Sequence, residues 1–381
     1  MRGYDFLDKL SLVDPAYIEA ADLMPKKKTS WLKWGIAACL TLVLCTVTVF
    51  CLSARLPRLP VSLGTVGIGY GFEGYWIRDI SDLKNTSPVS TDAAPSRLPV
   101  FRNPAGGYPV RDATEEYRAK MLTLSRTIEG RLVRNTEKMT ETWTESDGRI
   151  TPLTLLAKGS DDVEIRVDQF MTAEIWYPSR DPKGEDYPLP RTYEETYQLA
   201  VKLLKEYRDL LGFAEPQICI TGGDYDKDGK QFYDISIYDA TGSNTDHLLQ
   251  FFCRRANFYC NTDGEPWLIR MLCTDLSDEV GNYPIITAQQ AQKLLVKGHC
   301  ISSCPYEMPG EKYIRKVELI YRCGIYDEYF MPYYRFYVEL PEDSLPAELQ
   351  DGEFSNVGAY YVPAVEEEYL APLSTWDGRF N

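Results

Sequence analysis

Histidine is nearly absent from this sequence, and the catalytic motifs that depend on it are absent too. The 381 residues include only 2 His, His247 and His299. Histidine is the usual general base and metal ligand near neutral pH, and a nucleophile needs such a base beside it. Neither G-x-S-x-G nor H-E-x-x-H occurs in the chain. We therefore predict no catalytic residues and expect a protein that is not an enzyme.

Complete motifs for metals and cofactors are also missing. Residues 224–229 read D-x-D-x-D-G, the spacing of a calcium loop, but the twelfth position is Ile235 instead of glutamate. A polar hairpin turn is the preferred interpretation, and calcium at Asp224, Asp226 and Asp228 stays open. His299-Cys300-x3-Cys304 lacks the second close ligand pair of a zinc site. We predict no metal ligands and no cofactor.

The glycine-rich segment 69–74 is formally G-x-G-x-x-G. A dinucleotide site needs a helix that begins at such a loop, so that its N-terminus faces the pyrophosphate. The residues that follow, Tyr75-Trp76-Ile77-Arg78, do not begin one. We therefore predict a glycine-permitted turn and no cofactor-binding residues.

Positive charge is in deficit, with 41 Lys and Arg against 56 Asp and Glu and a net charge of −15. A surface of that sign repels nucleic acid, so no nucleic-acid partner is expected. Cations or basic peptides are the electrostatically favoured partners. An acidic surface that is merely solvated explains the same charge.

Residues 34–52 contain no charged residue and no proline. The length of this stretch matches the roughly 20 residues that cross a bilayer as a helix. Lys26, Lys27, Lys28 and Lys33 precede it, which places the N-terminus in the cytoplasm by the positive-inside rule. A cleaved signal peptide is the competing interpretation, but Leu52-Ser53-Ala54 is a poor cleavage site.

We accordingly predict a cell-membrane, single-pass protein with an extracellular C-terminal portion. Residues 1–30 are the cytoplasmic tail, and residues 31–52 form a transmembrane helix whose partner is the lipid bilayer. The tail has apolar residues at helical intervals, among them Val13, Tyr17 and Ile18, and could bind a cytoplasmic protein. Oligomeric state is left open.

Ten cysteines are present, and Cys39, Cys45 and Cys51 fall within the predicted membrane segment. Seven remain, an odd number that cannot pair completely within one chain. The sequence therefore predicts no disulfide map.

Beyond a Pro/Gly-rich linker at 53–111, one pattern occurs three times. Asp112-x-x-Glu115, Thr192-x-x-Glu195 and Thr287-x-x-Gln290 each precede a helical run of apolar residues. Gly130, Gly212 and Gly298 would end these helices. Strand-like runs follow at 163–167, 172–177, 217–221, 233–238, 248–253, 267–273, 316–322, 333–340 and 359–365. The pattern predicts an α+β class, with helix-on-antiparallel-sheet units at 112–190, 191–281 and 282–381.

One strand-like stretch is exceptionally aromatic. Residues 329–337 read YFMPYYRFY. Such a stretch could form a ligand-contacting face of a sheet. Alternation between core and surface is the competing interpretation, and we prefer it.

Several segments resemble a group of single-pass envelope proteins from Clostridia-like Firmicutes. They are GYGFEGYWIRDISDL, GGDYDKDGKQFYDISIYD, YPIITAQQAQKLLVKGHCISSCPYEMPGEKYIRKVELIY, EYFMPYYRFYVELP and AYYVPAVEEEYL. The helix-then-sheet units also look like PepSY and YycI/YycH-type modules, which implies regulation outside the membrane. The tail YDFLDKLSLVDPAYIEAADL is similar to anti-sigma-factor tails, which implies a sigma factor as partner. The resemblance supplies no catalytic residues.

Together these observations predict a membrane-anchored extracytoplasmic regulatory or sensor protein. Its outer units would bind an envelope peptide or protein, and its tail would contact a cytoplasmic regulator such as a sigma factor. The alternatives are an anchored binding or inhibitor module without signalling and, third, an envelope hydrolase.

Overall fold

Strands outnumber helices in the described chain, and several of them alternate buried and partly exposed residues. In β5 (Glu164–Asp168), Ile165 and Val167 are fully buried and their neighbours are not, as expected for a sheet with one apolar face. The structure is a computed structural model that describes residues 56–61, 73–84, 87–106, 111–132, 139–147, 151–159, 162–183, 191–226, 228–324, 327–345, 353–372, 375 and 378. All the elements below belong to one compact unit that begins at Leu56.

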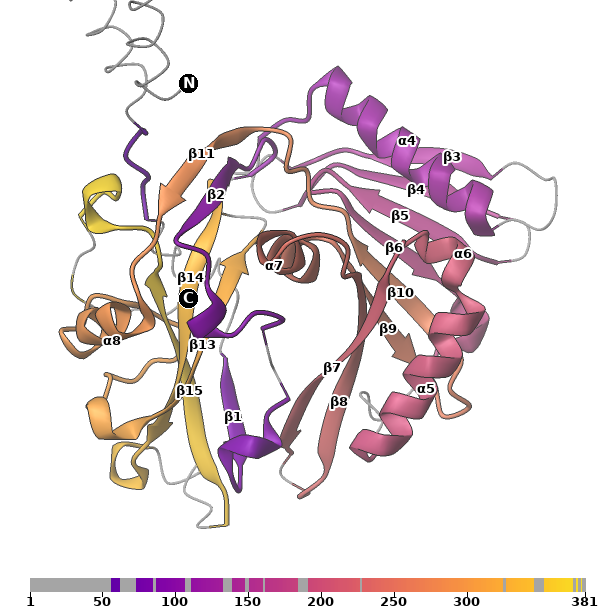
Figure 1. Cartoon of the computed structure of the whole chain (residues 1–381). Helices are drawn as coiled ribbons and strands as arrows, with labels where there is room; N and C mark the ends of the chain where they lie inside the picture. The colour runs from indigo at the N-terminus through magenta and orange to yellow at the C-terminus, as the bar shows by residue number, and fades with distance from the viewer. Residues whose placement is uncertain are drawn as a thin grey trace, which may run out of the picture. The chain divides into compact units, whose positions relative to one another are not determined.

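The first sheet has eight antiparallel strands in the order β3-β4-β5-β6-β10-β9-β8-β7 (Figure 1). Its apolar face, which includes Leu155 and Ile269, packs against helices on the outside of the unit. The opposite face carries polar residues such as Ser236 and Asn257, whose side chains share a hydrogen bond of 2.8 Å. Besides β5, its strands are β3 (Thr140–Thr144), β4 (Thr154–Lys158), β6 (Thr172–Trp176), β7 (Pro216–Tyr225), β8 (Gln231–Asp239), β9 (Arg255–Cys260) and β10 (Pro266–Leu272).

The second sheet has seven strands, with β1-β15-β14-β2-β11 as its main order. In addition, β12 pairs with β15 and β13 pairs with β14. Tyr334 and Phe336 of β14 lie in one apolar cluster with Leu295 of helix α8 (Ala288–Val296), which comes earlier in the chain. The strands are β1 (Gly74–Ile77), β2 (Arg97–Arg102), β11 (Glu279–Pro284), β12 (Ile301–Ser302), β13 (Ile314–Arg322), β14 (Tyr329–Leu340) and β15 (Ser355–Pro363).

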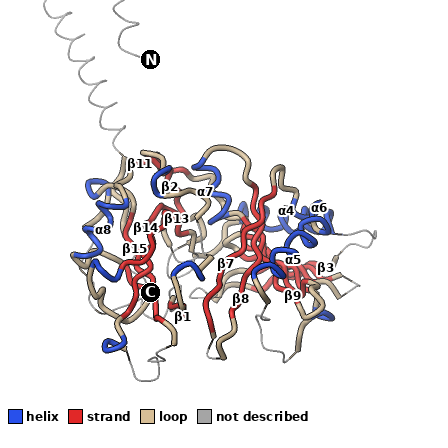
Figure 2. The backbone as a smooth tube through the Cα atoms, turned by 60° about the horizontal axis from the view of Figure 1, so that its bottom comes forward, coloured by secondary structure: helices blue, strands red, loops and turns tan. Residues whose placement is uncertain are grey.

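Helices cover the outer face of each sheet, and one helix lies between the sheets. Figures 1 and 2 both place α7 between the two sheets, where it contacts β13 of one and β8 and β9 of the other. The α-helices are α4 (Glu115–Leu132), α5 (Tyr193–Glu206) and α6 (Arg208–Leu211) against the first sheet, α7 (Asn244–Cys253) between the sheets, and α8 (Ala288–Val296) against the second. Short 3-10 helices are η1 (Ile80–Asp82), η2 (Thr91–Ala93), η3 (Pro178–Arg180), η4 (Glu311–Tyr313), η5 (Glu342–Ser344) and η7 (Glu367–Tyr369).

Two of the three predicted helix starts are confirmed as capping boxes. Thr192 begins α5 and Thr287 begins α8, each with reciprocal side-chain and backbone hydrogen bonds. The third predicted helix is present and begins at Glu115, where Thr114 Oγ1 accepts the Tyr117 N–H at 3.2 Å. Helix α4 also continues past Gly130 to Leu132.

The predicted strand at 248–253 is wrong, because these residues belong to helix α7. Ser243 and Asp246 form a capping box that fixes the helix start. Leu248 and Phe251, three residues apart, are both buried, as helical spacing permits.

The predicted α+β class of repeated helix-on-sheet units is corrected by the topology. The described residues form two large, mostly antiparallel sheets with few helices. Strands from residues 140–176 pair with strands from 216–272 in one sheet, because the apolar pattern alone does not decide which strands become neighbours.

The predicted N-terminal transmembrane helix is corrected too. No helix in the described ranges is long and apolar enough to cross a membrane. Residues 31–52, on which that prediction falls, lie outside these ranges.

Candidate functional site

A cavity of about 340 Å³ lies beside α7, and both sheets contribute to its wall. We call it the central cavity. Its polar lining contains three arginines and one glutamate, and its apolar lining is largely aromatic. The lining residues are Glu73, Thr221, Phe251, Phe252, Arg255, Leu272, Ser303, Ile320, Tyr321, Arg322, Cys323, Arg335 and Tyr361.

The period of the strands explains why charged groups reach this cavity from an otherwise apolar sheet. Leu319 and Tyr321 of β13 belong to the apolar cluster that includes α8. Glu318, Ile320 and Arg322 alternate with them and therefore face the other way. Arg335 of β14 is the register partner of Glu318. A polar face thus forms on the cavity side of the second sheet.

Ion pairs connect Arg335 to two glutamates, of which Glu318 is buried and Glu73 is half-buried. Its guanidinium is 2.8 Å from Glu318 Oε2 and 3.2 Å from Glu73 Oε1. Lys316 Nζ lies 2.9 Å from Glu318 Oε1. Burial opposes the charge of Arg335, but Tyr337 and the neighbouring acidic groups outweigh it and raise its pKa. Arg335 is therefore a permanent cation.

Tyrosine hydroxyls complete the shell around Glu73. Tyr75 and Tyr361 both donate hydrogen bonds to its carboxylate, and Tyr337 donates to Glu318 at 3.1 Å. Burial is the main cause that raises the pKa of Tyr75 and Tyr361. Both hydroxyls are therefore neutral donors at pH 7, and the oxygens of Glu73 accept hydrogen bonds from several partners.

Aromatic rings lie against the other two arginines. Arg322 lies 5.4 Å from the ring centroid of Tyr333 and 5.1 Å from that of Tyr361. Arg255, the first residue of β9, lies 5.1 Å from the ring centroid of Phe251 on α7. Its Nε is buried and has no hydrogen-bond partner among the described residues. Burial lowers the pKa of Arg255, but a guanidinium stays protonated near neutral pH.

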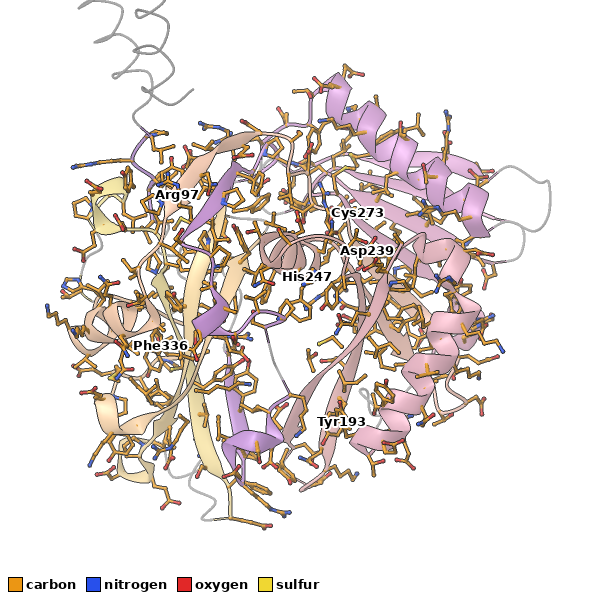
Figure 3. All side chains as sticks on the ribbon, viewed as in Figure 1. Arg97, Tyr193, Asp239, His247, Cys273 and Phe336 are labelled. Carbon is orange, nitrogen blue, oxygen red and sulfur yellow. A yellow bond between two sulfur atoms is a disulfide. The ribbon has the colours of Figure 1, made fainter. Side chains whose placement is uncertain are left out.

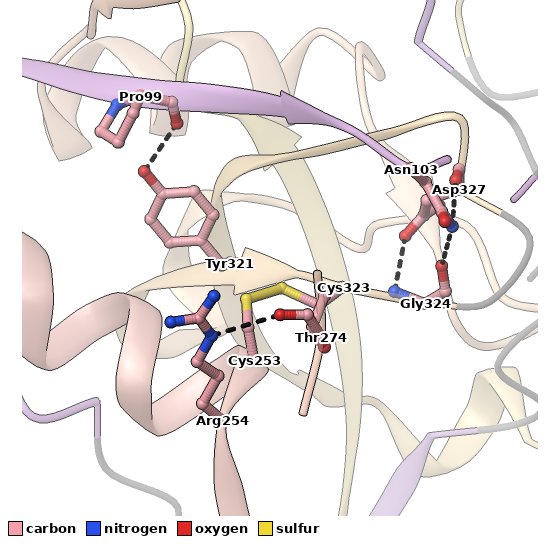
Figure 4. Close-up of a disulfide and its surroundings, with 9 residues drawn as sticks. All are labelled: Pro99, Asn103, Cys253, Arg254, Thr274, Tyr321, Cys323, Gly324 and Asp327. Atoms are coloured by element: carbon pink, nitrogen blue, oxygen red, sulfur yellow. Dashed lines mark hydrogen bonds between the residues drawn. A yellow bond between two sulfur atoms is a disulfide. The ribbon is translucent and has the colours of Figure 1, made fainter. Parts of the chain in front are cut away.

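A disulfide joins α7 to the second sheet at the edge of the cavity. Cys253 at the end of α7 is bonded to Cys323, which follows β13 and lines the cavity (Figure 4). Nearby, Tyr321 donates to the carbonyl of Pro99 at 2.8 Å, and Arg254 donates to that of Thr274 at 3.2 Å. The end of α7 is therefore fixed covalently to one sheet and hydrogen-bonded to the chain that follows β10 of the other.

The structure places the candidate calcium loop in a hairpin turn between β7 and β8. Asp226 Oδ1 accepts the N–H groups of Asp228 and Lys230 at 2.8 and 2.9 Å. Gly229 adopts a positive φ of 72°, which a turn requires. The hairpin interpretation is confirmed, and no group of three metal-binding side chains occurs among the described residues.

The remaining sequence candidates do not meet in one place. Figure 3 places His247 on α7, whereas His299 follows α8. Cys300 and Cys304 are buried in the apolar cluster that contains Tyr360. Gly69–Phe72 of the glycine-rich segment, and Val13, Tyr17 and Ile18 of the tail, lie outside the described residues.

Sequence reasoning found the strand of Arg335 but missed the site. In the aromatic stretch, the consecutive residues Phe336 and Tyr337 are both fully buried, so the predicted alternation of core and surface is wrong there because both faces of β14 are covered, while Arg335 lines the cavity. The available signal was a charge inside each apolar strand, namely Glu318 in β13 and Arg335 in β14. Glu73 and Tyr361 are 288 residues apart in the chain, so their contact could not be foreseen.

Comparison of the chain with protein-family models, with curated proteins and with solved structures finds no match.

Proposed function

We propose that this chain is a regulatory or sensor protein that binds a small ligand in the central cavity. The observation that carries the proposal is a cavity of about 340 Å³ with walls from both sheets and α7. Concave sites of this size are typical of small-molecule binding. A ligand in this position contacts both sheets, so its binding free energy would favour one arrangement of them, as a sensor requires.

The state of Glu73 favours binding over hydrolysis. Tyr75, Tyr361 and Arg335 all donate to this carboxylate. A general base needs an oxygen free to take a proton from water or substrate. The polar groups of the cavity are thus arranged to orient a ligand.

We also propose that the described unit works outside the reducing cytosol. The Cys253–Cys323 disulfide supports this location, because structural disulfides persist in oxidising compartments. Contact of residues 1–30 with a cytoplasmic regulator such as a sigma factor, and of the outer part with an envelope peptide, stay predictions.

A bulky substitution that fills the central cavity tests this proposal. Thr221→Trp introduces a bulky ring from β7, and Thr142→Trp on the exposed strand β3 is the matched control. Native mass spectrometry and thermal-shift measurements with a panel of small acids, amines, sugars and nucleotides would compare the variants. We expect at least one compound to stabilise the wild type and Thr142→Trp but not Thr221→Trp. Equal stabilisation of all three proteins, or of none, would overturn the proposal.

A further inference from the structure

The central cavity carries more positive than negative charge, although the chain as a whole has a net charge of −15. Arg335 is neutralised by Glu73 and Glu318, and Lys316 shares Glu318 with it. Glu73 is the one acidic residue among the lining residues described above. Arg255 is therefore a cation in excess of these ion pairs.

Arg255 is the cation with the weakest internal compensation. No ion pair or hydrogen bond of its side chain occurs in the described part of the chain, and its Nε is a buried donor without a partner. Asp234 of β8 attracts it only through space, and Arg335 acts on it as a like charge. The neighbouring thiol of Cys219 is neutral at pH 7, because burial raises its pKa to about 11.

This arrangement of Arg255 costs free energy in the protein alone. Arg255 is half-buried, with its Nε fully buried, and taking a charge partly out of water without a hydrogen-bonded partner of opposite sign is unfavourable. The repulsion between Arg255 and Arg335 adds to that cost. An anion in the cavity would remove both penalties.

Apolar residues border the same space. Phe251 and Phe252 of α7 meet edge to face, with ring centroids 4.8 Å apart. Leu272 and Ile320 line the cavity from the two sheets. A ligand that is purely ionic would leave this apolar surface wet, whereas one with a hydrocarbon or aromatic body would bury it.

We propose that the ligand of the central cavity is an organic carboxylate, with its carboxylate group held by the guanidinium of Arg255 and its apolar body against Phe251, Phe252, Leu272 and Ile320. The planar fork of a guanidinium matches a carboxylate with two parallel hydrogen bonds. The ring of Phe251, stacked on Arg255, holds that fork in place. This proposal rests on the proposed function and names its ligand class.

The experiment uses unbranched monocarboxylates from acetate to decanoate, phenyl-substituted carboxylates, the primary amide of each, and phenyl phosphate. We expect at least one carboxylate to bind the wild type in calorimetry while its amide does not. Arg255→Met should weaken that binding by about 10- to 100-fold, the range for loss of a charge-assisted pair. Arg270→Met is the matched control, because Arg270 lies on the polar face of the same sheet but pairs with Glu174 at 2.8 Å.

A second readout separates a ligand anchor from a structural residue. Without ligand, Arg255→Met should be at least as stable to urea as the wild type, because it removes a half-buried charge that has no ion pair. A structural arginine would instead lose stability on substitution. A large loss of stability, or unchanged carboxylate affinity in Arg255→Met, would overturn the role of Arg255.

The outcomes also distinguish this proposal from the proposed function. Preference for phenyl phosphate over every carboxylate would overturn the ligand class, as would equal binding of acids and amides. If Thr221→Trp still abolished binding of another compound in those cases, the central cavity would remain the ligand site.

Discussion

Asp168 shows how burial changes the chemistry of a single residue. It ends β5, and its Oδ1 accepts the N–H groups of Phe170 and Thr172, both at 2.9 Å. Burial raises the pKa of this carboxyl to about 6, although these hydrogen bonds oppose the shift. The folded protein therefore holds a proton that the unfolded chain releases near pH 4.

This difference predicts a pH dependence that Asp168→Asn should remove. Between about pH 4 and pH 6 the folded state binds the extra proton, so the free energy of unfolding falls as pH rises through this window. Asn retains an oxygen acceptor but does not titrate. We expect the stability of Asp168→Asn relative to wild type to increase by up to about 3 kcal/mol over this range. Urea unfolding at several pH values measures the difference in free energy of unfolding between the variant and the wild type. A difference that does not change with pH would contradict the prediction.

Helix α7 shows how a local cap decides the type of an element. Its apolar residues resemble a short strand, and Ser243 and Asp246 convert the segment to a helix by capping each other. The hydrogen bonds of Ser243 also hold the pKa of Asp246 below its usual value. The capped helix brings Phe251 and Phe252 to the central cavity.

Loss of this cap should weaken the protein measurably. Ser243→Ala removes the side-chain acceptor and should lower the free energy of unfolding by about 1 kcal/mol. Ser243→Thr retains a hydroxyl and should cost less. Urea unfolding of both variants at pH 7 gives the comparison. Equal losses for Ala and Thr would show that the hydroxyl does not cap the helix.

At the scale of the whole described unit, two sheets and one internal helix are held together by few covalent constraints. The Cys253–Cys323 disulfide joins positions 70 residues apart. Cys219, Cys260, Cys273, Cys300 and Cys304 are free. The disulfide is thus the covalent link, within the described residues, between α7 and the second sheet.

Removing that link should lower stability strongly. Closing a loop of this length contributes about 4 kcal/mol through the reduced entropy of the unfolded chain. We expect Cys253→Ala combined with Cys323→Ala to lose roughly that amount in urea unfolding. Dithiothreitol should reduce the stability of the wild type toward the value of the double variant and should leave the double variant unchanged. A response of the double variant to the reductant would assign the effect to another cysteine.

The sequence by itself determined most individual strands and two capped helices. Alternation in 163–167 and 316–322 fixed β5 and β13, since side chains on a strand alternate between faces. The boxes at Thr192 and Thr287 fixed α5 and α8, because capping depends on residues three positions apart. These interactions join residues that are only two or three positions apart, so they could be predicted without knowledge of the fold.

Only the tertiary structure decided the sheet order and the central cavity. Strand pairing depends on which apolar faces meet, and many pairings satisfy the same alternation. Glu73, Arg255 and Arg335 come from separate strands or strand ends. Their charges interact strongly only when folding brings them together and excludes water around them. The physical reason is that desolvation and ion pairing act through space, whereas sequence patterns report interactions along the chain.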